Sequence, residues 1–352
     1  MMRWMLLFVP ISIVMYFMKA PPIWMFVVSC LAIVPLAGLM GTATEELAKY
    51  QGASIGGLLN ATFGNATELI ICIVALQKNE LAIVKASLIG SIIGNILLVL
   101  GLSILLGGIK HKVQKFNITV AQSHATMLAM AAVALLIPAL FVRSVPGLKE
   151  TAANPQILEL SIGVAIVMIV LYIGSLVFSL YTHERLFKAA EDCPEDPPSW
   201  SQRNAILVLI AATIAIAFES ELLVGGIEPV VTSWHLSKLF VGIIIVPIIG
   251  NAAEHSTAVL MAMRNKMDIS LNIAVSSCTQ IAMFVVPVCI FISLIVGHPL
   301  TVLFSNFELI AVSAAVFIAI LISWDGQSQW LEGAQLLATY VIVALAFYFI
   351  AG

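Results

Sequence analysis

Long apolar runs, separated by short polar segments, account for almost all of the 352 residues of this chain. Each run is close to the roughly 20 residues that a helix needs to cross the hydrocarbon core of a bilayer. The polar segments between them are brief, as at Gln77–Glu80 and Arg264–Lys266. We predict eleven transmembrane helices, at residues 4–18, 22–43, 53–76, 81–109, 118–142, 156–181, 205–227, 236–263, 269–297, 302–324 and 329–351.

The composition agrees with an all-α, multi-pass membrane protein embedded in a lipid bilayer. Hydrophobic residues make up 61% of the chain, charged residues only 10%, and the mean hydropathy is +1.08. A soluble domain of this length could not cover its surface with so few charges. The formal net charge of −3 is too small to indicate a nucleic-acid partner.

One polar motif occurs twice inside apolar runs. Gly64-Asn65-Ala66-Thr67-Glu68 recurs as Gly250-Asn251-Ala252-Ala253-Glu254, at an offset of 186 residues. A charged side chain near the bilayer centre costs about 2.5–3.5 kcal/mol on insertion scales, and intramembrane ionisable groups usually mark a functional site. We therefore expect Glu68 and Glu254 to bind cations and protons, although a structural hydrogen bond is the alternative for each.

The asparagines of the two motifs are the next candidates. Asn65 and Asn251 each lie three residues before the glutamate, so amide and carboxylate share one helical face. Two such faces could meet and form an oxygen-lined site. We expect both asparagines to contribute to the cation and proton site, with interhelical hydrogen bonding as the alternative.

Further polar residues repeat in the same order in both halves. With one residue of slippage, Ser91 and Asn95 align with Ser276 and Gln280, and Gly90 and Gly94 form a close-packing G-x-x-x-G pattern. Glu45 and Glu221 lie in similar contexts and suggest a second acidic pair on a proton path. The accessory candidates are His255, Ser91, Asn95, Ser276, Ser277, Gln280, Glu45 and Glu221. For Glu45 and Glu221 the alternative is solvation at the membrane interface, and for the other residues it is packing or interhelical hydrogen bonding. Glu46 and Glu219 are expected to be solvated at helix ends.

The repeat predicts how the chain is divided. We expect an extra N-terminal helix at 1–20, a first five-helix repeat at 21–181, a cytoplasmic acidic linker at 182–203 and a second repeat at 204–352. Because five is odd, the second repeat enters the membrane from the opposite face and is inverted. Inverted repeats with polar sites near the midplane are typical of secondary transporters.

The distribution of basic residues predicts the orientation. With the N-terminus in the cytoplasm, ten Lys and Arg residues lie on the inner side and six on the outer side. The acidic segment Glu191–Asp196 is then cytoplasmic. It lacks the spacing of an EF-hand loop, so we interpret it as a solvated spacer.

The sequence has one match to an enzymatic motif, Gly52-Ala53-Ser54-Ile55-Gly56 for G-x-S-x-G. That motif requires a strand-to-helix turn, whereas this match lies between predicted membrane helices, so we interpret it as accidental. There is no nucleophile–base set, no H-E-x-x-H pattern and no C-x-x-C pair, so we expect no enzyme, no catalytic residue and no cofactor. The five scattered cysteines are expected to pack as small apolar residues.

The two motifs, together with Gly56-Gly57-Leu58-Leu59-Asn60-Ala61-Thr62-Phe63 and the helix layout, resemble the Ca²⁺/H⁺ antiporters over essentially the whole chain. These antiporters are the cation/proton exchanger branch of the cation/Ca²⁺ antiporter superfamily. The resemblance implies that Glu68 and Glu254 form the core of the cation and proton site. Sodium/calcium exchangers have a proline before the motif glutamate, where Thr67 and Ala253 stand here.

From these observations we expect a secondary active transporter that exchanges Ca²⁺ for H⁺ by alternating access, with Ca²⁺ and protons as its substrates. The alternatives are a Na⁺- or K⁺-coupled exchanger or, in a different class, a cation channel. The expected location is a prokaryotic plasma membrane, since the sequence is compact and starts without a long extension, with an organelle membrane as the alternative. A homo-oligomer is compatible with the sequence.

Overall fold

The computed structural model describes residues 3–145, 154–183 and 197–350, apart from the side chains at 3 and 52–54. These residues form helices almost throughout. Seven described helices are long and apolar enough to cross a membrane, and nine if two bent helix pairs each count as one span. Two shorter apolar helices, Trp4–Phe17 and Asn306–Ile322, coincide with two further predicted runs. The multi-pass membrane class is confirmed, and the count of eleven stays a prediction.

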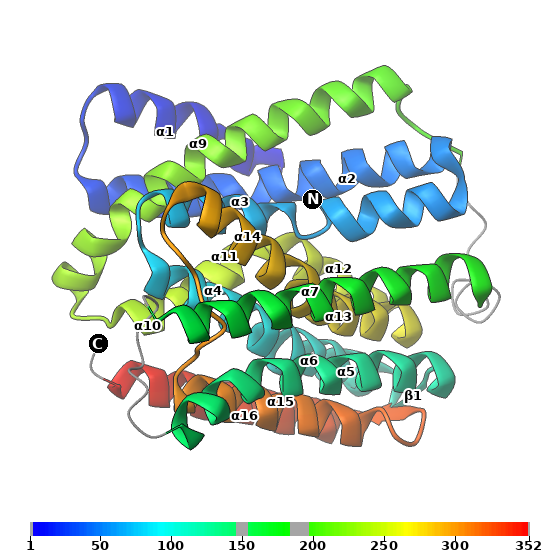
Figure 1. Cartoon of the computed structure of the whole chain (residues 1–352). Coiled ribbons are helices and arrows are strands. Elements are labelled where there is room, and N and C mark those ends of the chain that lie inside the picture. The colour runs from blue at the N-terminus through cyan, green and yellow to red at the C-terminus, as the bar shows by residue number, and fades with distance from the viewer. Residues whose placement is uncertain (1–2, 146–153, 184–196, 351–352) are drawn as a thin grey trace. The chain divides into compact units, whose positions relative to one another are not determined.

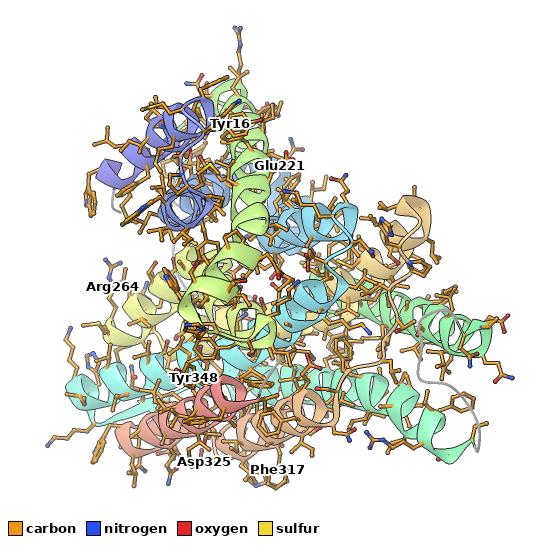
Figure 2. All side chains as sticks on the ribbon, turned by 90° about the vertical axis from the view of Figure 1, so that its left-hand side faces the viewer. Tyr16, Glu221, Arg264, Phe317, Asp325 and Tyr348 are labelled. Carbon is orange, nitrogen blue, oxygen red and sulfur yellow. The ribbon has the colours of Figure 1, made fainter. Side chains whose placement is uncertain are left out.

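Apolar side chains on the surface support the same class. Ile214, Ile295 and Ile310 are 66%, 85% and 64% exposed. Phe317, which is labelled at the lower edge of Figure 2, is 61% exposed. So many bare apolar side chains would drive aggregation in water, whereas they match the acyl chains of a bilayer.

The α-helices and strand β1 are labelled in Figure 1. In chain order the elements are η1 (Arg3–Leu7), α1 (Phe8–Phe17), α2 (Pro22–Phe63), α3 (Ala66–Gln77), α4 (Leu81–Ile93), η2 (Gly94–Val99), α5 (Leu100–His111), β1 (Val113–Lys115), α6 (Ile118–Ser144), α7 (Pro155–Val177), η3 (Phe178–Thr182), α9 (Gln202–Trp234), α10 (Lys238–Phe240), η4 (Val241–Ile245), α11 (Val246–Gly250), α12 (Ala252–Met263), α13 (Met267–Gln280), η5 (Ile281–Val285), α14 (Val286–Val296), α15 (Asn306–Ile322), β2 (Gln327–Gln329) and α16 (Trp330–Phe349).

Several helices begin where the sequence carries a capping residue. The side chain of Asn117 accepts hydrogen bonds from the first backbone N–H groups of α6, and Asn154, followed by Pro155, does so for α7. Ser201 caps α9, and Ser305 forms a reciprocal capping box with Glu308 at α15. These caps satisfy backbone donors that a helix end would otherwise leave without partners.

Helix α2 is longer than predicted. The sequence predicted a break between residues 43 and 53, but helical residues continue from Pro22 to Phe63. The intervening Glu45, Glu46, Leu47, Ala48 and Lys49 have high helix propensity, which explains the continuation. The part suited to a membrane span is Pro22–Gln51, and Ile55–Phe63 belongs to the first bent pair.

Two segments of π-helix precede a Val-Pro pair. Residues Val241–Ile245 lead into Pro247, and Ile281–Val285 lead into Pro287. Proline has no N–H and its ring clashes with the carbonyl four residues earlier in an α-helix. The wider turn of a π-helix accommodates both effects and lets the apolar helix continue.

The described chain forms two compact units, each of which draws on both halves of the sequence. The first contains residues Met1–Gly90, Cys193–Glu254 and Ala344–Gly352, and the second contains Ser91–Asp192 and His255–Val343. The predicted domain boundaries follow the repeat rather than these units and stay a prediction. The acidic segment Glu191–Asp196 lies outside the described residues.

In the first unit, α2 and α9 pack along each other (Figure 1). Their shared apolar core, which α3 joins through Ala66, contains Leu36, Met40, Ala43, Leu209, Ala212 and Ile216. Helix α4 meets η4 closely, because a Cβ atom on Gly90 would overlap the backbone of Ile243. The close packing predicted for Gly90 is therefore confirmed, whereas a Cβ atom on Gly94 would find open space.

In the second unit, α6 packs against α13 and α15, and α7 packs against α14 and η5. Tyr172 stacks on Phe284, with ring centroids 5.6 Å apart. The sequence did not predict strands, but β1 and β2 pair antiparallel with Gln114 opposite Ser328. Strands of three residues are too short to produce a readable alternation.

Candidate functional site

Each copy of the repeated motif interrupts a helix. The first break lies between Phe63 and Ala66 and bends the chain by 42°; the second lies at Asn251 and bends it by 63°. Asn65 has φ −102° and ψ 21°, and Asn251 has φ −94° and ψ 5°. Both asparagines thus occupy the same sparsely populated backbone region, which is common at functional sites. The two motifs share a local structure as well as a sequence.

The breaks place both glutamates at the start of a helix. Glu68 lies in the first turn of α3, and Glu254 lies in the first turn of α12. The first N–H groups of a helix have no intrahelical partner, and the helix dipole is positive at this end. The position therefore favours a carboxylate and offsets part of the cost of holding a charge away from water.

The two motifs cross each other within the first unit. A Cβ atom on Gly64 would lie 3.5 Å from Oε1 of Glu254, and one on Gly250 would lie 3.3 Å from Oε1 of Glu68. Each carboxylate therefore packs against the glycine of the other motif. The charge of Glu254 also acts on Glu68. The structure brings together the two glutamates that the sequence singled out.

The site is largely closed to its surroundings. Glu68 is 4% exposed, Asn65 and Asn251 are each 1% exposed, and Glu254 is half-buried. The amide of Asn251 donates to the carbonyl of Pro247 at 3.0 Å, one turn before the break. Among the described residues, Oε2 of Glu68 has no hydrogen-bond partner. A buried carboxylate oxygen in that state is suited to receive a proton or a cation.

Three of the accessory candidates form a hydrogen-bonded row in the second unit. Asn95 donates from Nδ2 to Oγ of Ser277 at 2.9 Å, and Nε2 of His255 lies 3.1 Å from Oδ1 of Asn95. Asn95 lies in the π-helical segment η2. Ser91 is buried beside this segment, and Ser276 and Gln280 are half-buried.

The acidic residues of α2 and α9 differ from one another in exposure. Glu45 and Glu221 are exposed, and the side chain of Glu221 lies 4.0 Å from Nζ of Lys78. Glu46 and Glu219, which we expected to be solvated, are 5% and 0% exposed. That expectation was wrong.

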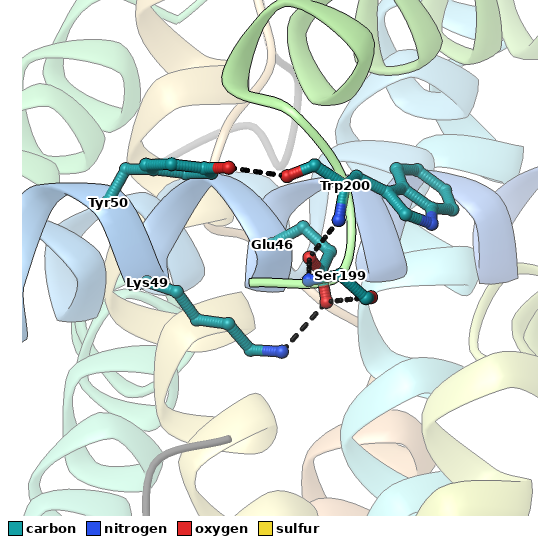
Figure 3. Close-up of polar contacts among 5 residues, drawn as sticks. All are labelled: Glu46, Lys49, Tyr50, Ser199 and Trp200. Carbon is teal, nitrogen blue, oxygen red and sulfur yellow. Dashed lines mark hydrogen bonds and ion pairs between the residues drawn. The ribbon is translucent and has the colours of Figure 1, made fainter. Parts of the chain in front are cut away.

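The two buried residues have different partners. Glu219 lies in the middle of α9 and accepts a hydrogen bond from Ser12 of α1. The sequence predicted that this helix ends at residue 227, whereas α9 continues to Trp234. The shorter helix placed Glu219 nearer to an end, and its burial was therefore not predicted. Glu46 accepts hydrogen bonds from the backbone N–H groups of Ser199 and Trp200 at 2.6 and 2.9 Å, and Lys49 lies 2.7 Å away (Figure 3).

No group of three or more His, Cys, Asp or Glu side chains suited to a metal ion occurs within residues 3–145, 154–183 and 197–350. A cation held by the two motif carboxylates would therefore take its remaining ligands from amide side chains, backbone carbonyls and water. Such an oxygen-only set suits a hard cation that is bound transiently.

Comparison with known proteins identifies the family. The family model described as sodium/calcium exchanger protein matches residues 21–181 and 204–349. The chain belongs to this family. Both copies of the motif lie within the matched residues.

Curated relatives are similar along nearly the whole chain. A Ca²⁺/H⁺ antiporter of Aphanothece halophytica is 45% identical, over 98% of this chain and 95% of its own length. The Ca²⁺/H⁺ antiporter ChaA of Bacillus subtilis is 47% identical, over 97% and 96%. The vacuolar cation/proton exchanger 1 of Arabidopsis thaliana is 40% identical, over 97% and 76%. The resemblance to Ca²⁺/H⁺ antiporters predicted from the sequence is confirmed.

Solved structures agree with this placement. The structure of native YfkE matches with a TM-score of 0.84 and 44% identity, over 97% of each chain. A structure of the H⁺/Ca²⁺ exchanger CAX matches with a TM-score of 0.70 and 13% identity, over 99% of this chain and 91% of that one. The second likeness is one of fold alone. The transporter fold of this chain is confirmed.

Proposed function

We propose that this family member is a secondary active transporter that exchanges Ca²⁺ for H⁺ across a membrane. The observation that carries the proposal is the crossing of the two motifs at two helix breaks, which sets the carboxylates of Glu68 and Glu254 each beside the glycine of the other motif. Relatives named Ca²⁺/H⁺ antiporters that match nearly the whole chain support the choice of ions.

The proposed site binds either one Ca²⁺ or protons, and never both together. Two carboxylates carry two negative charges, which one divalent ion or two protons can neutralise. Ca²⁺ takes about 6–8 oxygen ligands at flexible geometry, so Asn65, Asn251, backbone carbonyls and water complete its shell. Mg²⁺ gives up its water reluctantly and binds poorly in the same site.

Coupling follows from the cost of moving charge through the membrane interior. An empty site with two ionised carboxylates is too costly to reorient, because charges in a low-dielectric region lose their hydration. Binding Ca²⁺ or protons removes the net charge, and only then does the carrier change its accessible side. Coupled exchange therefore requires only that the site reorients when its net charge has been neutralised.

The finer layout belongs to the same proposal. It comprises eleven transmembrane helices, with one extra N-terminal helix and two inverted five-helix repeats. The N-terminus lies in the cytoplasm, in a prokaryotic plasma membrane. Matching breaks after Phe63 and Gly250 support the repeat, and alternating access then arises from movement of helices around the fixed site.

The experiment is a coupled flux measurement on purified protein in liposomes. An inwardly directed Ca²⁺ pulse is expected to drive H⁺ out, and an imposed pH gradient to drive uptake of ⁴⁵Ca. Replacing the pH gradient by a Na⁺ or K⁺ gradient is expected to give no uptake. Uptake that follows the Na⁺ or K⁺ gradient, or Ca²⁺ entry without any H⁺ movement, contradicts the proposal.

A further inference from the structure

Two lysines join the helices of the carboxylate site to α9. The first, Lys78, directly follows α3, the helix whose first turn carries Glu68. Its Nζ donates to the backbone carbonyl of Glu221 at 2.8 Å and lies 4.0 Å from the carboxylate of the same residue. A Cβ atom on Gly225 would lie 3.4 Å from this Nζ, so the ammonium group lies over α9 at a position that has no side chain.

The second, Lys238, opens the helical run α10–η4–α11 that ends at Gly250, just before Glu254. Its Nζ lies 2.6 Å from Oε2 of Glu228 on α9 and 3.3 Å from Oε2 of Glu80. Glu80 stands between α3 and α4. Lys238 therefore bridges α9 and the end of the first motif's helix.

Both lysines bind one face of α9. Glu221 and Glu228 are seven residues apart, which is about two turns of a helix and places them on the same side. Glu221 is labelled beside α9 in Figure 2. The helix that follows Glu68 and the helix that leads to Glu254 are thus attached to neighbouring positions of a single element.

The ion pairs of both lysines are weak because their side chains are exposed to solvent. The side chains of Lys78 and Lys238 are 33% and 35% exposed, and those of Glu221 and Glu228 are 68% and 63% exposed. Ion pairs at such exposure are screened by salt and break easily. The other end of α9 differs, because Glu46 of α2 is only 6% exposed at its side chain and binds Ser199, Trp200 and Lys49 (Figure 3).

We propose that Lys78 and Lys238, with Glu80, Glu221 and Glu228, form a charge clamp that holds α9 against both site helices in this conformation and opens when the carrier changes its accessible side. The inference rests on the proposed function for the meaning of that change. The clamp is the solvent-exposed attachment of α9 to the site helices, while the Glu46 contacts hold the residues just before α9, Ser199 and Trp200, to α2. Under the predicted topology, the clamp lies on the outer side.

A distance measurement tests the clamp independently of transport. In a background with the native cysteines replaced, spin labels are attached at Gln77→Cys and Thr232→Cys, two exposed positions next to the clamp. The distance distribution is recorded by pulsed electron paramagnetic resonance for the parent, for Lys238→Gln and for Lys19→Gln. Lys19 is an exposed lysine outside the clamp, so Lys19→Gln removes the same charge as a control.

We expect two populations in the parent, one at a shorter and one at a longer distance between the labels. The fraction of molecules at the longer distance is expected to rise several-fold in Lys238→Gln and to remain unchanged in Lys19→Gln. Lys238→Arg, which keeps a positive charge facing both Glu228 and Glu80, is expected to retain the parent distribution. A single distribution that no clamp variant alters, or a Lys238→Arg variant no closer to the parent than Lys238→Gln, overturns the inference. If the clamp opens as expected but the parent protein does not exchange Ca²⁺ for H⁺, the proposed function fails and the clamp stands.

Discussion

At the residue scale, the site depends on two glycines as much as on two carboxylates. Gly64 and Gly250 leave room for the glutamate of the other motif, and a side chain at either position would compete with it. The sequence revealed the glutamates because a charge within an apolar run is conspicuous. It did not reveal that the glycines face the opposite carboxylates, since that contact exists only between distant segments.

Gly250→Ala tests this contact. The added Cβ would lie 3.3 Å from Oε1 of Glu68, so the neighbouring carboxylate must shift by a few tenths of an ångström. We expect Ca²⁺ uptake to fall on the order of tenfold, because ligand groups in a tight site tolerate little displacement. The measurement is pH-driven ⁴⁵Ca uptake at several Ca²⁺ concentrations.

Gly163→Ala is the matched control, because a Cβ atom there would meet nothing within 4 Å. It is expected to transport at the rate of the parent protein. Equal uptake in Gly250→Ala and Gly163→Ala would show that the space beside Glu68 does not matter. Thermal unfolding of both variants in detergent separates a local effect from a loss of folding.

At the scale of elements, the helix breaks could be located from the sequence only in part. The run 53–76 was predicted as one helix and the run 236–263 as another, whereas each contains a bend at its Gly-Asn pair. Neither Asn65 nor Asn251 interrupts the apolar pattern. Periodicity alone therefore did not separate the helix before each bend from the helix after it. The continuation of α2 through Glu45 and Glu46 was missed for the opposite reason, because polar residues were interpreted as a loop.

The attachment of α9 to α2 yields a second prediction. Glu46→Gln removes the charge that Lys49 and the N–H groups of Ser199 and Trp200 bind. We expect backbone amides at residues 199–204 to exchange hydrogen about tenfold faster, because this end of α9 opens locally more often. Hydrogen exchange followed by mass spectrometry measures the change.

Glu159→Gln, which neutralises an exposed carboxylate of α7, is the control for that measurement. Exchange at 199–204 is expected to match the parent in this variant. If Glu46→Gln also leaves the exchange at 199–204 as it was, Glu46 does not fix the start of α9.

At the scale of the whole molecule, composition decided the class of the protein but not the number of spans. Exposed apolar side chains such as Ile214 and Ile310 follow directly from a chain that is 61% hydrophobic. The compact units each combine segments from both sequence halves. A repeat found by alignment reports ancestry and local structure, whereas packing is decided by contacts between distant helices, so the units could not be read from the repeat.

The predicted topology has a direct consequence for the chain ends. With eleven spans and a cytoplasmic N-terminus, the C-terminus after α16 lies on the outer side. Fusions to alkaline phosphatase, which is active outside the bacterial cytoplasm, are expected to be active at the C-terminus and inactive at the loop near Arg264. Green fluorescent protein fused at the same two positions is expected to give the reverse pattern. A fluorescent C-terminal fusion would indicate an even number of spans.

The most direct test of the central claim is pH-driven ⁴⁵Ca uptake in proteoliposomes containing Glu68→Gln or Glu254→Gln. Each substitution leaves one charge in a site that we propose needs two, so both variants are predicted to lose uptake, while Glu159→Gln retains it. Uptake at the parent rate in both Glu68→Gln and Glu254→Gln would remove the crossed carboxylates from the mechanism.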